Sequence, residues 1–123
     1  MGSLNEHITK ARHNENFIDS FDLDHSPFLD WAVNGIFYSA LHYLDSYFAK
    51  RNMHPPNHTI RNQFINSTNL DVVLYGAYRQ LRDDSRDARY ETRAFTPDEI
   101  RHDILPQLKV IKNCLRDSGL QIP

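Results

Sequence analysis

Residues 31–48, WAVNGIFYSALHYLDSYF, are the stretch that decides the fold. Read at 100° per residue, they place a wide apolar stripe on a helix that we expect to run from Ser26 to about Arg51. Ser26 and Pro27 are typical of a helix start, because serine caps free backbone N–H groups and proline fits the first helical position. A helix of this kind needs other helices to cover it. The stripe consists of Ala32, Val33, Ile36, Phe37, Ala40, Leu44, Tyr47 and Phe48.

The same helix has a second face of small and amphipathic side chains. Small residues spaced by three and four positions let the axis of another helix come close. That helix could belong to this chain or to a second copy in a homodimer, and the sequence leaves both alternatives open. The second face consists of Trp31, Gly35, Tyr38, Ser39, His42, Ser46 and Ala49.

Four further helices are expected, and strand patterns are almost absent. The first follows Ser3, whose hydroxyl can cap it while the side chain of Glu6 reaches back to the serine. Two prolines at 55–56 end the long helix, because they lack donors and restrict the residues before them. A short helix over about 58–66 and a longer one over about 70–91 then follow.

The last helix begins at Thr96, which forms a predicted capping box with Glu99, and Pro97 takes the first helical position. Pro106 removes one backbone hydrogen bond and should kink the axis. Gly119 ends the helix. Short connections between long amphipathic helices favour antiparallel neighbours. The predicted fold class is therefore all-α, an up-and-down bundle of four or five helices.

Length and composition fit a single helical domain over residues 1–123 that is 40% hydrophobic and 24% charged. With a formal net charge of −2, nucleic acid would have to bind to a local basic patch. The first residues lack the layout of a secretory signal, and no apolar run reaches the roughly 20 residues of a membrane span. We therefore expect a cytoplasmic protein without membrane contact. Cys114 is the only cysteine, so we expect a core thiol and no disulfide.

Residues 78–90, YRQLRDDSRDARY, carry the candidate functional surface. Five arginines and no lysine lie between Arg79 and Arg93, and arginine is the side chain that forks onto phosphates. Neighbouring tyrosines could stack on bases. In the alternative interpretation, Asp83 neutralises Arg79 and Arg86 through helical ion pairs. The candidate ligand-binding residues are Tyr75, Tyr78, Arg79, Arg82, Arg86, Arg89 and Tyr90.

The opposite side of this helix is expected to face the core, because its apolar residues repeat at helical spacing. These residues are Leu70, Val73, Leu74, Ala77, Leu81 and Ala88.

Three segments, residues 34–42, 53–58 and 81–90, together resemble the HEPN superfamily, named for higher eukaryotes and prokaryotes nucleotide-binding. The resemblance implies a small helical bundle that often dimerises and works in stress, toxin–antitoxin or phage-defence systems. Catalytic members are metal-independent ribonucleases, marked by an arginine, a polar residue and a histidine four to six positions beyond. Arg82 is followed by an aspartate, but residues 84–90 contain no histidine. The resemblance therefore favours a binding module over an active ribonuclease.

Other residues could supply the missing imidazole. Arg51, followed by an asparagine, fits the motif with His58 across the diproline loop, and the resemblance places a histidine at His42. The alternative function is thus an endoribonuclease with Arg82 or Arg51 and one of these histidines as general acid–base. We expect no metal site, because the prolines between His54 and His58 prevent their pairing on a helix. No cofactor motif such as a glycine-rich phosphate loop is present.

The sequence thus predicts a module that binds RNA or another phosphate-bearing ligand through an arginine and tyrosine face. A third alternative is a purely structural domain that docks a partner protein through the second face of the long helix.

Overall fold

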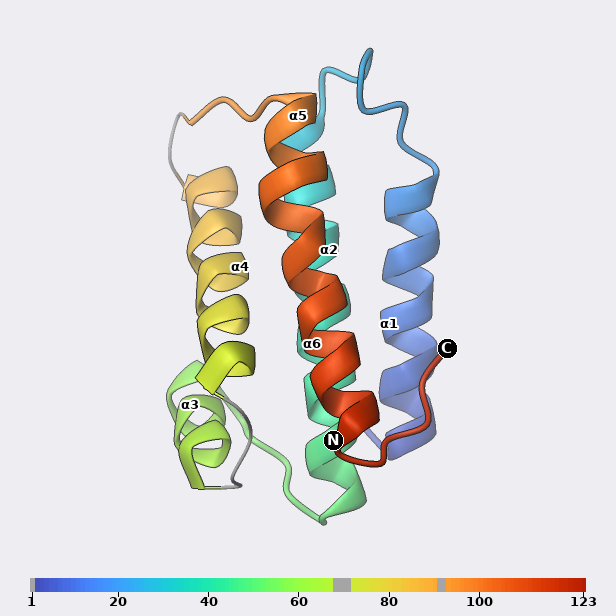
Figure 1. Ribbon diagram of the computed structural model, residues 1–123, viewed down its shortest axis with the longest axis vertical. Coiled ribbons are helices and arrows are strands. Elements are labelled where there is room, and N and C mark those ends of the chain that lie inside the picture. Colours follow the sequence, from blue (N-terminus) through green and yellow to red (C-terminus); the bar gives the residue numbers. More distant parts are fainter. Residues whose placement is uncertain (1, 68–71, 91–92) are drawn as a thin grey trace.

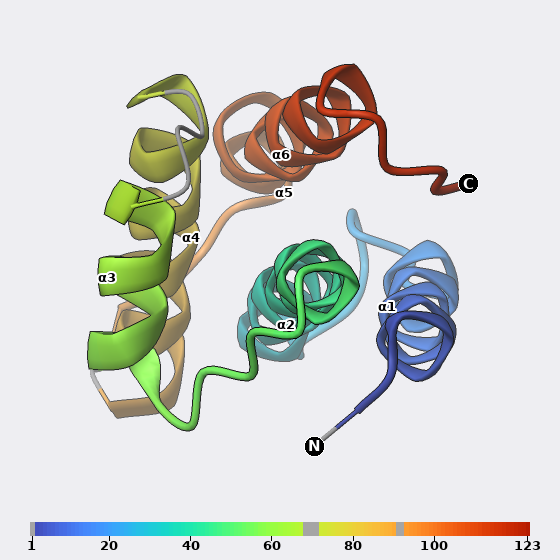
Figure 2. The ribbon, with the colours of Figure 1, turned by 90° about the horizontal axis from the view of Figure 1, so that it is seen from below.

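The computed structural model is an up-and-down bundle with α2 at its centre, which confirms the all-α class (Figures 1 and 2). It describes residues 2–67, 72–90 and 93–123, and no strand occurs in these ranges. None of the described helices is both long and apolar enough to cross a membrane. The elements are α1 (Leu4–Asp19), α2 (Leu29–Lys50), α3 (His58–Ser67), α4 (Val72–Tyr90), α5 (Pro97–Glu99), a π-helical turn η1 (Ile100–Ile104) and α6 (Leu105–Asp117).

Three long helices, α1, α4 and α6, pack around α2. Viewed along the bundle, α1 and α4 lie on opposite sides of α2, and α6 covers a third side (Figure 2). The short helix α3 sits at the end of the bundle where α4 begins (Figure 1). This arrangement leaves one side of α2, the side away from α6, without a long helix across it.

The predicted core stripe of α2 is confirmed, since all eight of its residues are buried. The predicted start is wrong by a few residues. The Ser26 hydroxyl does accept a hydrogen bond from the Phe28 N–H at 3.1 Å. Phe28 itself departs from helical geometry, with ψ at 42°, so the regular helix begins at Leu29. At the other end Asn52 adopts a left-handed conformation, φ 57°, and the chain turns away before the two prolines.

Most of the second face of α2 is covered from within the chain, by α1. A Cβ atom on Gly35 would stand 3.1 Å from the Phe17 ring and 3.2 Å from the Ile18 side chain, so glycine permits the close approach. The Ser39 hydroxyl donates to the Ala11 carbonyl at 2.7 Å. At these positions the intrachain alternative holds.

The start of α1 confirms the predicted capping box. The Ser3 hydroxyl accepts from the Glu6 N–H at 3.1 Å, and the Ser3 N–H donates to the Glu6 carboxylate at 3.2 Å.

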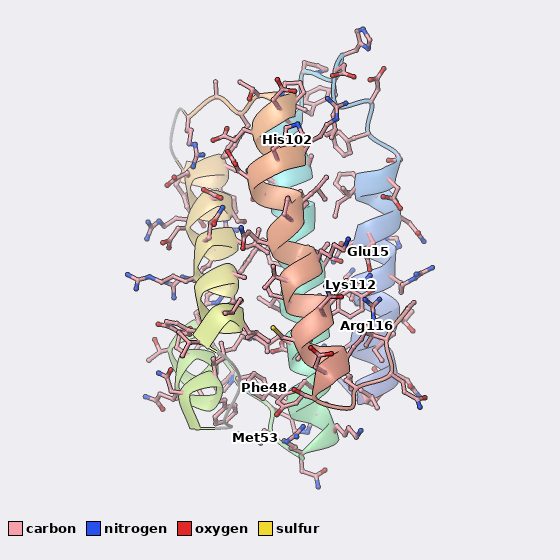
Figure 3. The ribbon with its side chains drawn as sticks, in the orientation of Figure 1. Glu15, Phe48, Met53, His102, Lys112 and Arg116 are labelled. Atoms are coloured by element: carbon pink, nitrogen blue, oxygen red, sulfur yellow. The ribbon has the colours of Figure 1, made fainter. Side chains whose placement is uncertain are left out.

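An ion pair joins α1 to α6 across the bundle (Figure 3). The Lys112 ammonium lies 3.1 Å from one Glu15 oxygen and 3.2 Å from the other. The Tyr43 hydroxyl of α2 also donates to Glu15. Burial, followed by this hydrogen bond, raises the pKa of Tyr43, so the phenol stays protonated and remains a donor. One carboxylate thereby connects three helices.

The last helix starts as predicted at Thr96, whose hydroxyl accepts from the Glu99 N–H at 3.1 Å. The capping box is incomplete, because the Glu99 carboxylate bonds to Arg93 instead. Where a kink at Pro106 is predicted, the structure has the π-helical turn η1, after which α6 begins with the proline in its first turn. The carbonyl of Asp103 then accepts from a side chain, the Gln80 amide, at 3.0 Å.

The core face of α4 is rotated relative to the prediction. Leu74, Ala77 and Leu81 are buried as expected, but Val73 is 57% exposed. Tyr78 is buried in its place, so the face that α4 turns toward α2 is centred nearer to Tyr78 than the apolar pattern indicates.

Three smaller expectations had mixed outcomes. Leu70 lies outside the described residues, and Ala88 is half-buried. Cys114, expected in the core, is only half-buried.

Substitutions at two glycines should have opposite effects on stability. Gly35→Leu should lower the free energy of unfolding by about 1–3 kcal/mol, because the side chain collides with α1. Gly76→Ala should raise it by about 0.5–1 kcal/mol, because a Cβ there meets nothing within 4 Å and alanine favours the helix. Urea denaturation followed by circular dichroism measures both changes. Equal stability of the two variants would contradict the described packing of α1 on α2.

Candidate functional site

A buried ion pair ties α3 to α2. Asp45 and Arg61 are each 6% exposed. The Arg61 Nε donates to Asp45 Oδ1 at 2.8 Å, and Nη2 donates to Oδ2 at 2.9 Å, a two-point contact that fixes both side chains. Burial opposes the charge of Arg61, but the hydrogen bonds and charge of Asp45 raise its pKa overall. Arg61 therefore keeps its positive charge in spite of its burial.

His58, at the start of α3, is held by this pair and by α4. Its Nδ1 lies 3.1 Å from the Tyr78 hydroxyl and 3.3 Å from Arg61 Nη1. A guanidinium can only donate, so Nδ1 accepts and the ring proton belongs on Nε2. Burial first, then the charges of Arg61, Arg82 and Arg89, lower the pKa of His58. The imidazole is neutral at pH 7 and keeps an N–H to offer.

Four arginines of α4, which we call the arginine face, have few negative neighbours. Within the described ranges Asp83 is the sole carboxylate within 4.0 Å of any of them, at 3.5 Å from Arg82 and 3.9 Å from Arg86. The predicted pair of Arg86 with Asp83 is thus confirmed, whereas no contact joins Arg79 to it in that part of the chain. The arginine face consists of Arg79, Arg82, Arg86 and Arg89.

The fifth arginine draws the other aspartates away. Arg93 Nη1 lies 2.8 Å from Asp84 and 3.1 Å from Asp87, and its Nη2 lies 2.5 Å from Glu99. These carboxylates turn toward Arg93 and α5, so they do not neutralise the arginine face. Among the described residues, the aspartates of α4 therefore leave most of the charge of the arginine face uncompensated.

Neutral partners position Arg89 at the junction of α4 and α2. Its Nη1 donates to the Ser85 hydroxyl at 2.6 Å and to the Tyr38 hydroxyl at 3.3 Å. Ser85 in turn donates to the Asn34 side-chain oxygen at 2.7 Å. The guanidinium also lies 5.4 Å from the centre of the Tyr90 ring. Arg89 is thus oriented by uncharged partners in the part of the chain that the structure describes.

The three tyrosines predicted to bind a ligand differ in how exposed they are. Tyr78 is fully buried and bonded to His58, so the prediction that it stacks on a ligand is wrong. Tyr75 is half-buried against the core. Tyr90 is 75% exposed at the end of α4. Arg51, proposed as a motif partner of His58, instead lies over the Tyr47 ring at 3.8 Å.

His42 contacts a histidine that sequence reasoning missed. Its Nδ1 lies 3.1 Å from Nδ1 of His7 on α1. Burial is the largest cause of a lowered pKa at both rings, and each also feels the charges of Asp45 and Arg61. His42 and His58 therefore lie near the same buried ion pair, although they bond to different partners.

Sequence reasoning also missed Asp45 and Arg61. One signal was available, because Asp45 is the single charged residue within 31–48, the most apolar stretch of the chain. A buried carboxylate needs a cationic partner. Nothing in the sequence identified Arg61 as that partner. In the described part of the chain, no group of three or more histidine, cysteine or acidic side chains is assembled to hold a metal ion.

No protein-family model matches this chain, and no curated protein or solved structure matches it. The functional argument therefore rests on the geometry of the site. The HEPN resemblance remains a prediction from the sequence.

Breaking the buried pair should be costly. Asp45→Ala leaves Arg61 buried without a counter-ion. The free energy of unfolding of this variant should be about 3–5 kcal/mol lower than that of the wild type. The double variant Asp45→Leu/Arg61→Leu removes both charges and should recover most of that loss. Urea titrations of the three proteins test this. If Asp45→Ala lowered the free energy of unfolding by less than the double variant, the result would contradict the description of the pair as buried.

Acidification should destabilise the protein before its carboxylates titrate. The pKa values of His7, His42 and His58 are lowered in the fold. Above their unfolded value of about 6.5 these rings are neutral in both states, and stability is fully present. Below it the unfolded chain takes up protons first, so stability falls as the pH drops below about 6.5. Thermal melts across this range should show a flatter decline in His42→Gln and His58→Gln, and a flat wild-type profile would refute the assignment.

Proposed function

We propose that the arginine face of α4, together with His58, binds a phosphate-bearing ligand such as RNA. The observation that carries this proposal is the imbalance of charge. Among the described residues, Asp83 is the one carboxylate within 4.0 Å of these four guanidinium groups, and it lies near Arg82 and Arg86 only. Arg93 holds the neighbouring Asp84 and Asp87. An uncompensated group of arginines is a surface suited to phosphates.

The surrounding groups add features that a phosphate ligand can use. The Nε2–H of His58 is a neutral donor close to the charges of Arg82 and Arg89. The exposed ring of Tyr90 offers a flat apolar surface next to the Arg89 guanidinium, on which a base can stack. The sequence resemblance to the HEPN superfamily supports the same ligand class and a role in a stress, toxin–antitoxin or phage-defence system.

The hydrogen bonds of His58 weigh against the ribonuclease alternative. A general acid must first be cationic, and three nearby arginines oppose that charge. To act as a general base through Nε2, the ring would have to carry its proton on Nδ1 instead. Arg61 Nη1 donates to Nδ1 from 3.3 Å, so a proton there would face another donor. Both catalytic states are disfavoured by the same neighbours, whereas a neutral donor to phosphate is favoured.

Binding of a labelled single-stranded RNA, measured by fluorescence anisotropy, tests the proposal. Arg82→Ala/Arg86→Ala should weaken binding by about tenfold or more, corresponding to at least about 1.4 kcal/mol. The slope of log affinity against log salt should become shallower by about 1.4, because two phosphate contacts to a single strand are lost.

The matched control is Arg12→Ala/Lys109→Ala, which removes the same charge from exposed positions on α1 and α6. The control should bind RNA like the wild type. Equal losses in both double variants, or no RNA binding at 50 mM salt, would reject the proposal and favour a protein partner instead. RNA cleavage in EDTA that disappears in His58→Ala would establish the ribonuclease alternative.

A further inference from the structure

Two exposed aromatic side chains share the side of α2 that none of the described long helices covers. Trp31 is 57% exposed and Tyr38 is 39% exposed. They are seven residues apart, nearly two helical turns, so they lie on one face of the helix. Around the axis this face falls between Gly35, which packs on α1, and Asn34, which is bonded to Ser85 of α4. The two rings therefore belong to the opening between α1 and α4, on the side away from α6 (Figure 2).

Arg89 joins this aromatic surface to the arginine face. Its guanidinium lies 5.8 Å from the centre of the Tyr38 ring and 5.4 Å from the centre of the Tyr90 ring. Its Nη1 also donates to the Tyr38 hydroxyl at 3.3 Å. A phosphate held by Arg89 would therefore lie beside Tyr38, and the neighbouring bases of its strand would meet exposed rings. Positive charge next to flat aromatic surfaces is the combination by which proteins bind single-stranded nucleic acids.

The spacing of the two rings favours bases that are not stacked on one another. At a rise of about 1.5 Å per residue, Trp31 and Tyr38 lie about 10.5 Å apart along the helix axis. Successive bases of a duplex strand are only about 3.4 Å apart, and each is covered by its neighbours. The bases of an unpaired strand can separate and lie on aromatic side chains. Each ring therefore suits its own base of a single strand.

We propose that Trp31 and Tyr38 stack on bases of a single-stranded RNA whose phosphates lie on the arginine face. The strand runs from α4 past Arg89 onto the open side of α2. This inference rests on the proposed function and adds two properties to it, which are the unpaired state of the ligand and the residues that contact its bases. Stacking needs a flat ring, whereas a face that only packs against a protein accepts aliphatic side chains as well.

The fluorescence of Trp31 tests the proposal directly, because it is the only tryptophan in the chain. A mixed-sequence single-stranded RNA of about ten nucleotides should quench this fluorescence. The quenching should saturate at the same RNA concentration as the anisotropy of the labelled strand. Inorganic polyphosphate carries negative charge without bases, so it should bind and leave the fluorescence unchanged. A duplex of the same sequence should likewise bind through its phosphates without quenching.

Substitutions at Trp31 separate stacking from simple apolar contact. Trp31→Leu should weaken binding of the single strand at least about fivefold, because it removes the ring. The slope of log affinity against log salt should stay the same, since no phosphate contact is lost. Trp31→Phe keeps a ring and should bind nearly as the wild type does. Tyr38→Leu and Tyr38→Phe should differ in the same way, and an unchanged affinity for polyphosphate in all four variants shows that they are folded.

Three outcomes would overturn the proposal. RNA binding that depends on Arg82 and Arg86 but neither quenches Trp31 nor weakens in Trp31→Leu would reject stacking and leave the proposed function standing. Fluorescence that changes with protein concentration in the absence of RNA would show that a second copy covers this face. If the wild type does not bind RNA at all, the proposed function and this inference both fail.

Discussion

The buried contact between Asp45 and Arg61 is the constraint on which the rest of the site depends. Asp45 places a carboxylate within the most apolar helix of the bundle, where an unpaired charge would be very unfavourable. Arg61 satisfies it with two hydrogen bonds, and α3 is thereby anchored to the side of α2. Because His58 lies one turn before Arg61 on α3, the same pair sets the position of that imidazole. The Nη1 group of Arg61 then determines which ring nitrogen of His58 carries the proton.

Charge is sorted along α4 by a similar mechanism. Arginines and aspartates alternate in its sequence, and alone such a helix would neutralise itself through pairs one turn apart. Arg93 prevents this, because it collects two aspartates of α4 together with Glu99 of α5. The acidic side of the helix is used to hold the start of the last helical segment. The basic side is left facing outward, and a chain with a net charge of −2 acquires a locally positive surface.

The sequence predicted the helices better than it predicted the contacts of polar side chains. Apolar periodicity, prolines and caps are local signals, and they correctly gave the core stripe of α2 and the start of α1. Val73 and Tyr78 were misplaced because the rotation of α4 about its axis depends on what α2 presents to it, which no local pattern encodes. The arginine face could be predicted because it lies on one helix. The contact of His7 with His42 spans 35 residues and exists only after α1 and α2 have packed.

Two histidine environments that differ in their charged neighbours lie near one buried ion pair. Around His58 the charged neighbours are mainly arginines, which favour the neutral imidazole and would attract an anion. Around His7 and His42 the charges of Asp45 and Arg61 act in opposite directions, and burial is the main cause of the lowered pKa of both rings. Asp45 lies near both histidine groups, but its carboxylate is hydrogen-bonded to Arg61 and not to either group. If the carboxylate were free, it would favour protonation of both histidine groups and remove the difference between them. The surroundings of both histidine groups thus depend in part on a single buried contact between α2 and α3.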